Sequence, residues 1–238
     1  MPVALKEAME TLLPDFERET AERVDVVVML NPEVPGYVVG GATWDLAMTN
    51  PCYVEEILAA GHGAPGSHRP FGRSPLAFGT RDADARLGGR QGRDVAELLL
   101  EAESIALTRT GTSGSTFARL VKTLGLRDAL EAKLRPMAGG GPMAALIAGE
   151  VDVAALPLTN IAPVPGVSAV AICPVALDVH IDLSMCLSRK ASETASALAE
   201  WLLDPARDVA LGRLGAERFS LDVRPNRFPE RLPARPPR

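Results

Sequence analysis

The sequence predicts an α/β protein in which a largely parallel sheet carries helices on both faces. Short apolar runs, several of them rich in β-branched residues, alternate with segments whose apolar residues recur at helical spacing. The apolar runs are continuous, which is typical of strands buried on both faces. At 238 residues and 47% hydrophobic side chains, the chain is long enough to bury a sizeable core as one large or two small domains.

Helices are predicted where helical spacing and end signals agree. Leu5 and Phe16 bound the first amphipathic pattern. Gly61 and Gly125 mark the ends of two helices, and Pro142 occupies the first helical position of another, where proline is favoured. The predicted helices span residues 5–19, 53–60, 95–102, 115–124, 142–148, 191–203 and 206–214.

Strands are predicted from the apolar runs between these helices. The run of residues 24–29 is β-branched and ends at Asn31-Pro32, a pair that marks a loop. Residues 82–92 are polar and glycine-rich and predict a surface loop, while the Arg/Pro-rich end at residues 224–238 predicts a disordered tail. The predicted strands span residues 24–29, 42–48, 75–79, 105–107, 151–156, 167–172 and 180–187.

Composition excludes several classes of protein. The net charge of −5, with both signs interspersed, predicts no nucleic-acid or anionic-lipid partner. Cys52, Cys173 and Cys186 share no metal-ligand spacing, so we expect neither a metal nor a cofactor. No run reaches the roughly 18 apolar residues of a membrane span, so no membrane insertion is expected.

The most informative segment is the loop between the predicted strand at 105–107 and the helix that follows it. Thr112, Ser113, Gly114 and Ser115 combine small size with hydroxyl donors next to unpaired N–H groups at a helix start. Such a loop suits a small anion, and Arg109 within it could pair with a carboxylate. The alternatives are that the hydroxyls cap their own helix and that Arg109 is solvated.

A second helix start has similar character. Three glycines end at Gly141, and Pro142 begins a helix about 30 residues after the first loop. Ligands of open α/β sheets bind at the carboxyl ends of strands, where loops enter helices. We therefore expect the two loops to meet in one site, although three glycines could also form a flexible connection.

The order of elements resembles type II periplasmic binding proteins, specifically the molybdate-binding-like family of solute receptors. The similarity covers residues 3–219. It is carried by VALKEAMETLLPDFERET, GATWDLAMTN, GSHRPFGRSPLAFGTR, ESIALTRTGTSGSTFARLVKTLGL, GGGPMAALIAGEVDVAAL and LLDPARDVALGRLGAERF.

The resemblance implies a two-lobed clamp. Residues 1–78 and 184–238 would form one lobe and residues 79–183 the other, each a mainly parallel sheet flanked by helices, with two crossing strands. The ligand would lie between the lobes. Expected ligand contacts are Ala4, Leu5, Asn31, Arg109, Thr112, Ser113, Gly114, Ser115, Gly141, Pro142, Pro157 and Thr159. Asn31 could equally form a turn.

Two departures from the family pattern affect these expectations. Ala4 stands where relatives often have serine, and Pro157 stands where molybdate binders have tyrosine, which favours a carboxylate or another oxyanion over molybdate. The chain also lacks the family's first strand. We therefore expect the native start to lie upstream with an export signal and the protein to be periplasmic; if Met1 is the start, it is cytoplasmic.

Two functions compete at this point. The first is a receptor that clamps a small oxyanion or carboxylate and delivers it to an ABC-type transporter permease, without catalysis. The second is an isomerase of an unsaturated carboxylic acid, since aconitate isomerase is similar to this family. His180 would then be the base, because its unperturbed pKa lies near neutrality; otherwise it is a strand histidine bonded within the hinge.

Overall fold

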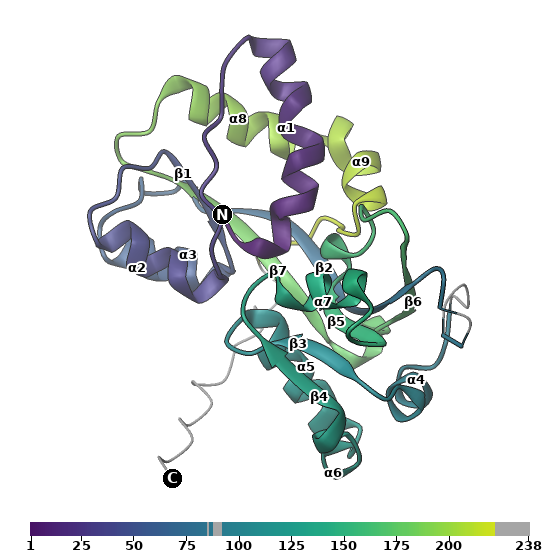
Figure 1. Ribbon diagram of the computed structural model, residues 1–238. Helices are drawn as coiled ribbons and strands as arrows, with labels where there is room; N and C mark the ends of the chain where they lie inside the picture. The colour runs from purple at the N-terminus through teal and green to yellow at the C-terminus, as the bar shows by residue number, and fades with distance from the viewer. Residues whose placement is uncertain (85, 88–91, 222–238) are drawn as a thin grey trace.

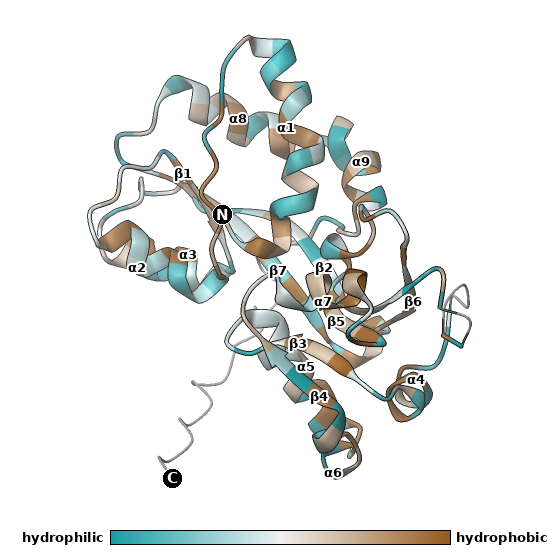
Figure 2. Ribbon diagram, viewed as in Figure 1, coloured by the Kyte–Doolittle hydropathy of each residue, from teal (hydrophilic) through white to brown (hydrophobic). Residues whose placement is uncertain are grey.

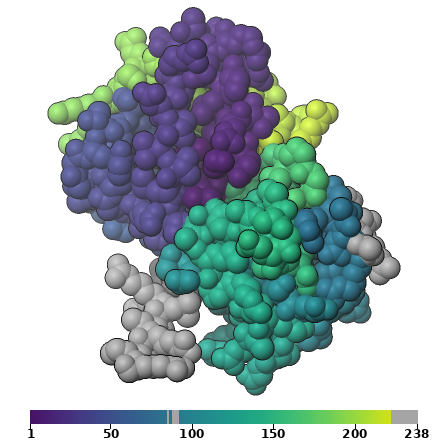
Figure 3. Space-filling view, viewed as in Figure 1, coloured from purple at the N-terminus to yellow at the C-terminus, as the bar shows by residue number. Residues whose placement is uncertain are grey.

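The computed structural model describes residues 1–84, 86–87 and 92–221, which form two lobes (Figure 1). The space-filling view shows them as two masses in contact (Figure 3). The upper lobe holds α1 (Lys6–Thr20), α2 (Val34–Val39), β1 (Leu46–Thr49), α3 (Pro51–Ala59), α8 (Glu193–Leu203) and α9 (Asp208–Arg213). The lower lobe holds α4 (Val95–Glu101), β3 (Ile105–Thr108), α5 (Thr112–Thr123), α6 (Arg127–Leu130), β4 (Leu134–Met137), α7 (Gly141–Ala148), β5 (Val153–Pro157) and β6 (Val167–Ile172).

Two strands, β2 (Arg69–Arg81) and β7 (His180–Leu187), connect the lobes through one continuous sheet. The strand order is β1-β7-β2-β5-β3-β4, with β6 also paired to β2. The first half of β2 pairs with β7 and its second half with β5 and β6, so the sheet passes between lobes near Pro75 and Leu76. The two-lobed α/β fold is therefore confirmed, while the exact lobe limits expected from the sequence stay a prediction.

The sheet is mixed. Strand β3 runs parallel to β4 and β5, whereas β2 is antiparallel to β5, β6 and β7, and β1 is antiparallel to β7. Parallel pairing is thus concentrated where β3 and β5 alternate with helices in the sequence. That arrangement brings the carboxyl ends of β3 and β5 to the edge of the lower lobe that faces the upper lobe (Figure 1).

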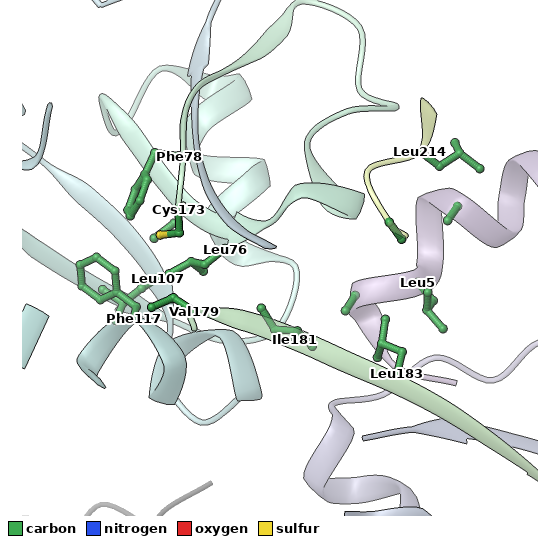
Figure 4. Packing of buried hydrophobic residues seen from close by; sticks show 14 of the residues in the cluster. Leu5, Leu76, Phe78, Leu107, Phe117, Cys173, Val179, Ile181, Leu183 and Leu214 are labelled. Carbon is green, nitrogen blue, oxygen red and sulfur yellow. The ribbon is translucent and has the colours of Figure 1, made fainter. Parts of the chain in front are cut away.

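One hydrophobic core continues through both lobes along β7 (Figure 4). In the lower lobe, Phe78 and Phe117 pack edge to face with their ring centroids 6.2 Å apart. In the upper lobe, Leu5 and Leu183 are fully buried. Ile181, also fully buried, lies between them on β7, so the connection between the lobes is a packed strand rather than a loose linker.

The strand predicted at residues 24–29 is absent from the structure, and that prediction was wrong. The run forms a single parallel bridge, Pro2 to Met29, and its hydrogen bonds go to the first residues of the chain and, from Val24, to the side chain of Glu17. Val26, Val27 and Val28 are 41%, 48% and 39% exposed. A β-branched run favours extended backbone, but a strand requires a neighbouring strand to pair with.

Other predictions are confirmed or corrected in detail. The predicted strand at 180–187 is β7, and the helices at 95–102 and 191–203 form within two residues of their limits. The strand at 75–79 is instead a 13-residue strand, and α2 and β4 were not predicted. The predicted tail at 224–238 lies outside the described residues, as does part of the loop at 82–92.

Candidate ligand-binding cleft

A cleft of about 640 Å³ lies between the two lobes. The upper lobe contributes the start of the chain, including the 3₁₀ turn η1 (Val3–Leu5), and the loop around Asn31. The lower lobe contributes the turns that enter α5 and α7, while Ile181 of β7 lies at the junction. The two helix starts predicted from the sequence therefore do converge on one cleft between the lobes.

The turn from β3 into α5 supplies backbone donors. Gly111 is the N-cap of α5, and Thr112 and Ser113 in the first turn line the cleft. First-turn N–H groups have no partner within their own helix and carry the positive end of the helix dipole. Gly114 is required here for space, because a Cβ at this position would lie 1.8 Å from the carbonyl oxygen of Thr108.

The turn into α7 brings the lower lobe against the upper lobe. Gly140 is the N-cap, with φ of +80°, a conformation that glycine adopts without strain. Gly139 and Gly140 line the cleft. A Cβ on Gly139 would lie 2.9 Å from Cδ2 of Leu30 in the upper lobe, so a glycine allows this close approach.

Hydrogen bonds cross between the lobes beside the cleft. The Thr112 hydroxyl donates to Oδ1 of Asn50 at 2.7 Å, and Asn50 in turn donates from Nδ2 to the carbonyl oxygen of Asp182 at 2.6 Å. All three residues are buried. The start of α5 is therefore connected through Asn50 to β7, one of the two strands that join the lobes.

The opposite wall of the cleft is fixed by the 3₁₀ turn η4 (Leu158–Asn160), which follows β5. The Thr159 hydroxyl donates to the carbonyl oxygen of Ala4 at 2.6 Å. Asn160 donates from Nδ2 to Val3 O at 2.9 Å and to a carboxylate oxygen of Glu7 at 2.5 Å. These bonds hold the start of the chain against η4 at the junction of the lobes. The Thr159 hydroxyl donates its proton to Ala4 and is therefore not available to a ligand.

Asn31 is a buried donor that faces the cleft. It is 5% exposed, and the Thr49 hydroxyl lies 3.0 Å from its carbonyl oxygen and 3.1 Å from its Oδ1. These contacts occupy the oxygen end of the side chain. Within the described part of the chain, no hydrogen bond uses its Nδ2, so two N–H donors remain available to a guest.

Five of the twelve contacts expected from the sequence line the cleft: Ala4, Asn31, Thr112, Ser113 and Pro157. Four others are used elsewhere: Leu5 lies in the core, Arg109 is exposed and donates to Pro136 O, Ser115 donates to Thr112 O, and Thr159 bonds Ala4. Gly114, Gly141 and Pro142 lie beside the lining residues without being among them.

The twelve expected contacts do not include the other residues that line the cleft. These are Val3, Lys6, Glu7, Val28, Leu30, Thr108, Gly111, Gly139, Gly140, Met143, Ala144, Ile147, Leu156, Asn160, Val164 and Ile181. Gly139 and Gly140 were available as the start of the triple glycine. The apolar members carry no local signal of a binding role, because core positions have the same composition.

His180 lies on the other face of β7 from the cleft. Its neighbour Ile181 lines the cleft, and side chains alternate between the faces of a strand. The His180 Nδ1 lies 3.3 Å from Asp178 and its Nε2 lies 3.5 Å from Asp182. A general base must reach the ligand, so this geometry gives no support to the isomerase alternative.

Asp182 also anchors an ion pair across the two connecting strands. Arg73 of β2 donates to its two carboxylate oxygens at 2.6 and 3.0 Å, and the Asp182 side chain is only 2% exposed. Burial raises the pKa of this carboxyl, but the hydrogen bonds from His180 and Arg73, together with the positive charge that these partners carry, outweigh burial and hold the pKa below its usual value. Asp182 is therefore a structural anion at the junction.

The described residues include neither a buried thiol that ionises readily nor a cluster of metal ligands. Burial raises the pKa of Cys173 and of Cys186 to about 12, so neither thiol supplies a thiolate near neutral pH. No group of His, Cys, Asp or Glu among these residues is placed to hold a metal ion. Over the same part of the chain, no helix combines the length and the hydropathy that a bilayer crossing needs.

Solved structures share this fold. The periplasmic molybdate-binding protein of Azotobacter vinelandii is 16% identical, with a TM-score of 0.77 over 90% of this chain and 96% of its own. The sulfate-binding protein SubI of Mycobacterium tuberculosis H37Rv is 14% identical, with a TM-score of 0.65 over 93% and 86%. PEB3 with bound L-phospholactate, a protein of Campylobacter jejuni, is 11% identical, with a TM-score of 0.64 over 91% and 96%.

At these identities, the likeness shows the fold alone, which is the two-lobed fold of type II periplasmic binding proteins. No curated protein matches the sequence. The family model described as "Bacterial extracellular solute-binding protein" matches residues 1–215, from the start of the chain to just beyond α9. The chain therefore belongs to the family of bacterial extracellular solute-binding proteins.

Proposed function

We propose that this protein is the solute receptor of an ABC-type transporter and clamps a small anion between its lobes. The observation that carries the proposal is the convergence of neutral donors from both lobes on one cleft. The first turn of α5, the turn into α7 and the amide of Asn31 all line it. Preorganised N–H donors at helix starts bind oxyanions and carboxylates without requiring a compensating cation.

Closure of the lobes would be the step that binding controls. Thr112 belongs to the anion-binding turn and is also hydrogen-bonded to Asn50 of the other lobe. A ligand that accepts hydrogen bonds from both Thr112–Gly114 and Asn31 contacts both lobes only when they are together. It therefore stabilises the closed form by its differential affinity for that form, which is the requirement for a ligand-driven shift.

The proposal includes a location and a partner. The receptor acts outside the cytoplasm, in the periplasm when exported, and presents its closed, loaded form to the permease. Membership of an extracellular solute-binding family supports this location. In this proposal, the permease distinguishes loaded from empty receptor by the relative position of the two lobes, which β2 and β7 connect.

A binding panel tests the proposal on the whole chain. Molybdate, tungstate, sulfate, phosphate, acetate, succinate and citrate are each titrated by calorimetry and by thermal shift. A ligand at 100 times its Kd stabilises the fold by about 2.7 kcal/mol, which raises the Tm of a domain of this size by about 5–11 °C. Absence of a shift with every anion, including the larger organic acids below, would contradict the proposal.

Two variants locate the site. Asn31→Asp keeps the shape of the side chain but replaces two donors with a negative charge, so we expect the affinity for the anion to fall at least tenfold. Ser196→Ala is the control: its hydroxyl lies on α8 and makes a 3.3 Å bond to Ser192 O, away from the cleft. Unchanged affinity in Asn31→Asp would place the anion elsewhere.

A further inference from the structure

Large parts of the cleft are apolar, and this feature is not explained by binding of a bare oxyanion. Lining residues of the lower lobe include Met143, Ala144 and Ile147 of α7, and Val164 lies beside them. Opposite them, the upper lobe contributes Val28. Hydrogen-bond donors line one part of the cleft and hydrocarbon side chains line another. One ligand could therefore form hydrogen bonds in the first part and apolar contacts in the second.

The apolar part is exposed as well as apolar. Ile147 is 57% exposed and Val28 is 39% exposed, although burial of such side chains is favourable. Helix α7, with the sequence GPMAALIA, has no polar side chain on its exposed side, so its coloring in Figure 2 runs from white to brown. A helix that is apolar on every side is typical of one that something covers.

The volume of the cleft also favours a ligand larger than a bare oxyanion. The cleft holds about 640 Å³, within the range of about 300–1,000 Å³ that is usual for sites of organic ligands. A tetrahedral oxyanion takes the place of only a few water molecules, each of about 30 Å³ in the liquid. Such an ion, held at the start of α5, would leave the walls formed by α7 and Val28 in contact with water.

Charge limits the ligand to a weakly charged head group. The charged side chains that line the cleft are Lys6 and Glu7, of opposite sign. Glu7 accepts from Asn160, and Lys6 is half-exposed with its Nζ 3.4 Å from Glu10. Arg109 donates to Pro136 O and is not among the lining residues. The donors in the cleft are thus mostly neutral, which suits one negative charge better than two or three.

On the basis of the proposed receptor function, we infer that the ligand is an organic monoanion with an apolar body, such as a medium-chain or branched monocarboxylate. Its carboxylate accepts hydrogen bonds from the backbone N–H groups in the first turn of α5 and from Asn31 Nδ2. Its hydrocarbon lies against Met143 and Ile147. Burial of the Met143 and Ile147 side chains by this hydrocarbon adds hydrophobic affinity to that of the hydrogen bonds.

A chain-length series tests this inference. Acetate, butyrate, hexanoate and 4-methylpentanoate are titrated into the full chain beside succinate, citrate, sulfate and molybdate. Each methylene that enters the apolar part should lower Kd about fourfold until the cleft is filled. A flat series together with tight binding of sulfate, molybdate or citrate would overturn the inference and leave the receptor function standing; no binding by any anion would overturn both.

A variant pair locates the apolar contact. Ile147→Ser should weaken hexanoate binding at least fivefold and leave the weak binding of acetate unchanged, because only the longer acid reaches α7. Ile172→Ser is the matched control, since Ile172 is 44% exposed on β6 and does not line the cleft. Equal loss for acetate and hexanoate in Ile147→Ser, or equal effects of both variants, would overturn the inference.

Discussion

The position of Gly114 allows a steric prediction with a measurable magnitude. This residue lies in the first turn of α5, and a Cβ added to it would lie 1.8 Å from the carbonyl oxygen of Thr108. Real Cβ atoms do not approach a backbone oxygen so closely, so Gly114→Ala must move the start of α5 away from the end of β3 by more than 1 Å. Neither atom can rotate away, because the backbone fixes the position of a Cβ and the carbonyl oxygen is itself part of the backbone.

The cost of that movement is expected to reach the upper part of the range for overpacked sites, about 3 kcal/mol. For a domain of this length, about 3 kcal/mol corresponds to a fall in Tm of about 6–12 °C. Displacement of the first turn also moves Thr112 and Ser113, which line the cleft, so ligand affinity should fall in the same variant.

Gly36→Ala provides the control for this experiment. Gly36 lies inside α2, and a Cβ there would meet nothing within 4 Å. Alanine is the better helix former, so the substitution should stabilise the protein by about 0.4–1 kcal/mol. The melting temperatures of both variants are measured by calorimetry. If Gly114→Ala melts no lower than Gly36→Ala, the steric conflict expected between α5 and β3 is contradicted.

Three further predictions concern the lobe connection and the thiols. The pKa of Asp182 is lowered in the fold, so the stability it contributes is present above its unfolded pKa of about 3.8 and is lost as pH falls through the lower folded value. Asp182→Asn should therefore cost several kcal/mol at pH 7 by leaving Arg73 unpaired, and urea melts should show the difference from wild type shrink below about pH 4; a constant difference would refute this. Thr112→Val removes the hydrogen bond between the lobes and should lower the free energy of unfolding by about 1–3 kcal/mol. Urea unfolding measures this loss, and a midpoint equal to that of the wild type would contradict the prediction. Cys173 and Cys186 should stay unmodified by a thiol reagent at pH 8 in the native protein and react once it is unfolded, as intact mass would show; rapid native labelling of either would contradict their burial.

Local signals determined which segments could be predicted. β7 at His180–Leu187 and α4 at Val95–Glu101 were predictable because apolar residues at alternate positions and a capped amphipathic pattern each specify one kind of structure over their own length. Residues 24–29 have the composition of a strand and β4 does not, yet only β4 forms. Strand β4 forms because β3 offers it a parallel partner, and no pattern in Leu134–Met137 announces that partner.

The candidate site divides in the same way. The turns entering α5 and α7 were predictable as donor loops, since small and hydroxyl residues before a helix are a local feature. The sequence did not indicate which way the side chains of Arg109 and His180 point. Arg109 donates to a carbonyl on the neighbouring strand, and His180 lies on the face of β7 opposite to Ile181.

The amino-acid sequence by itself determined the alternation of strands and helices, the family resemblance and the two turns rich in donors, because each depends on residues close together in the chain. Only the tertiary structure decided that these turns share a cleft with Asn31, and that α7 gives that cleft an apolar wall. The physical reason is that a binding surface is assembled from both lobes. Which face of each strand and helix it uses depends on packing between residues more than 100 positions apart.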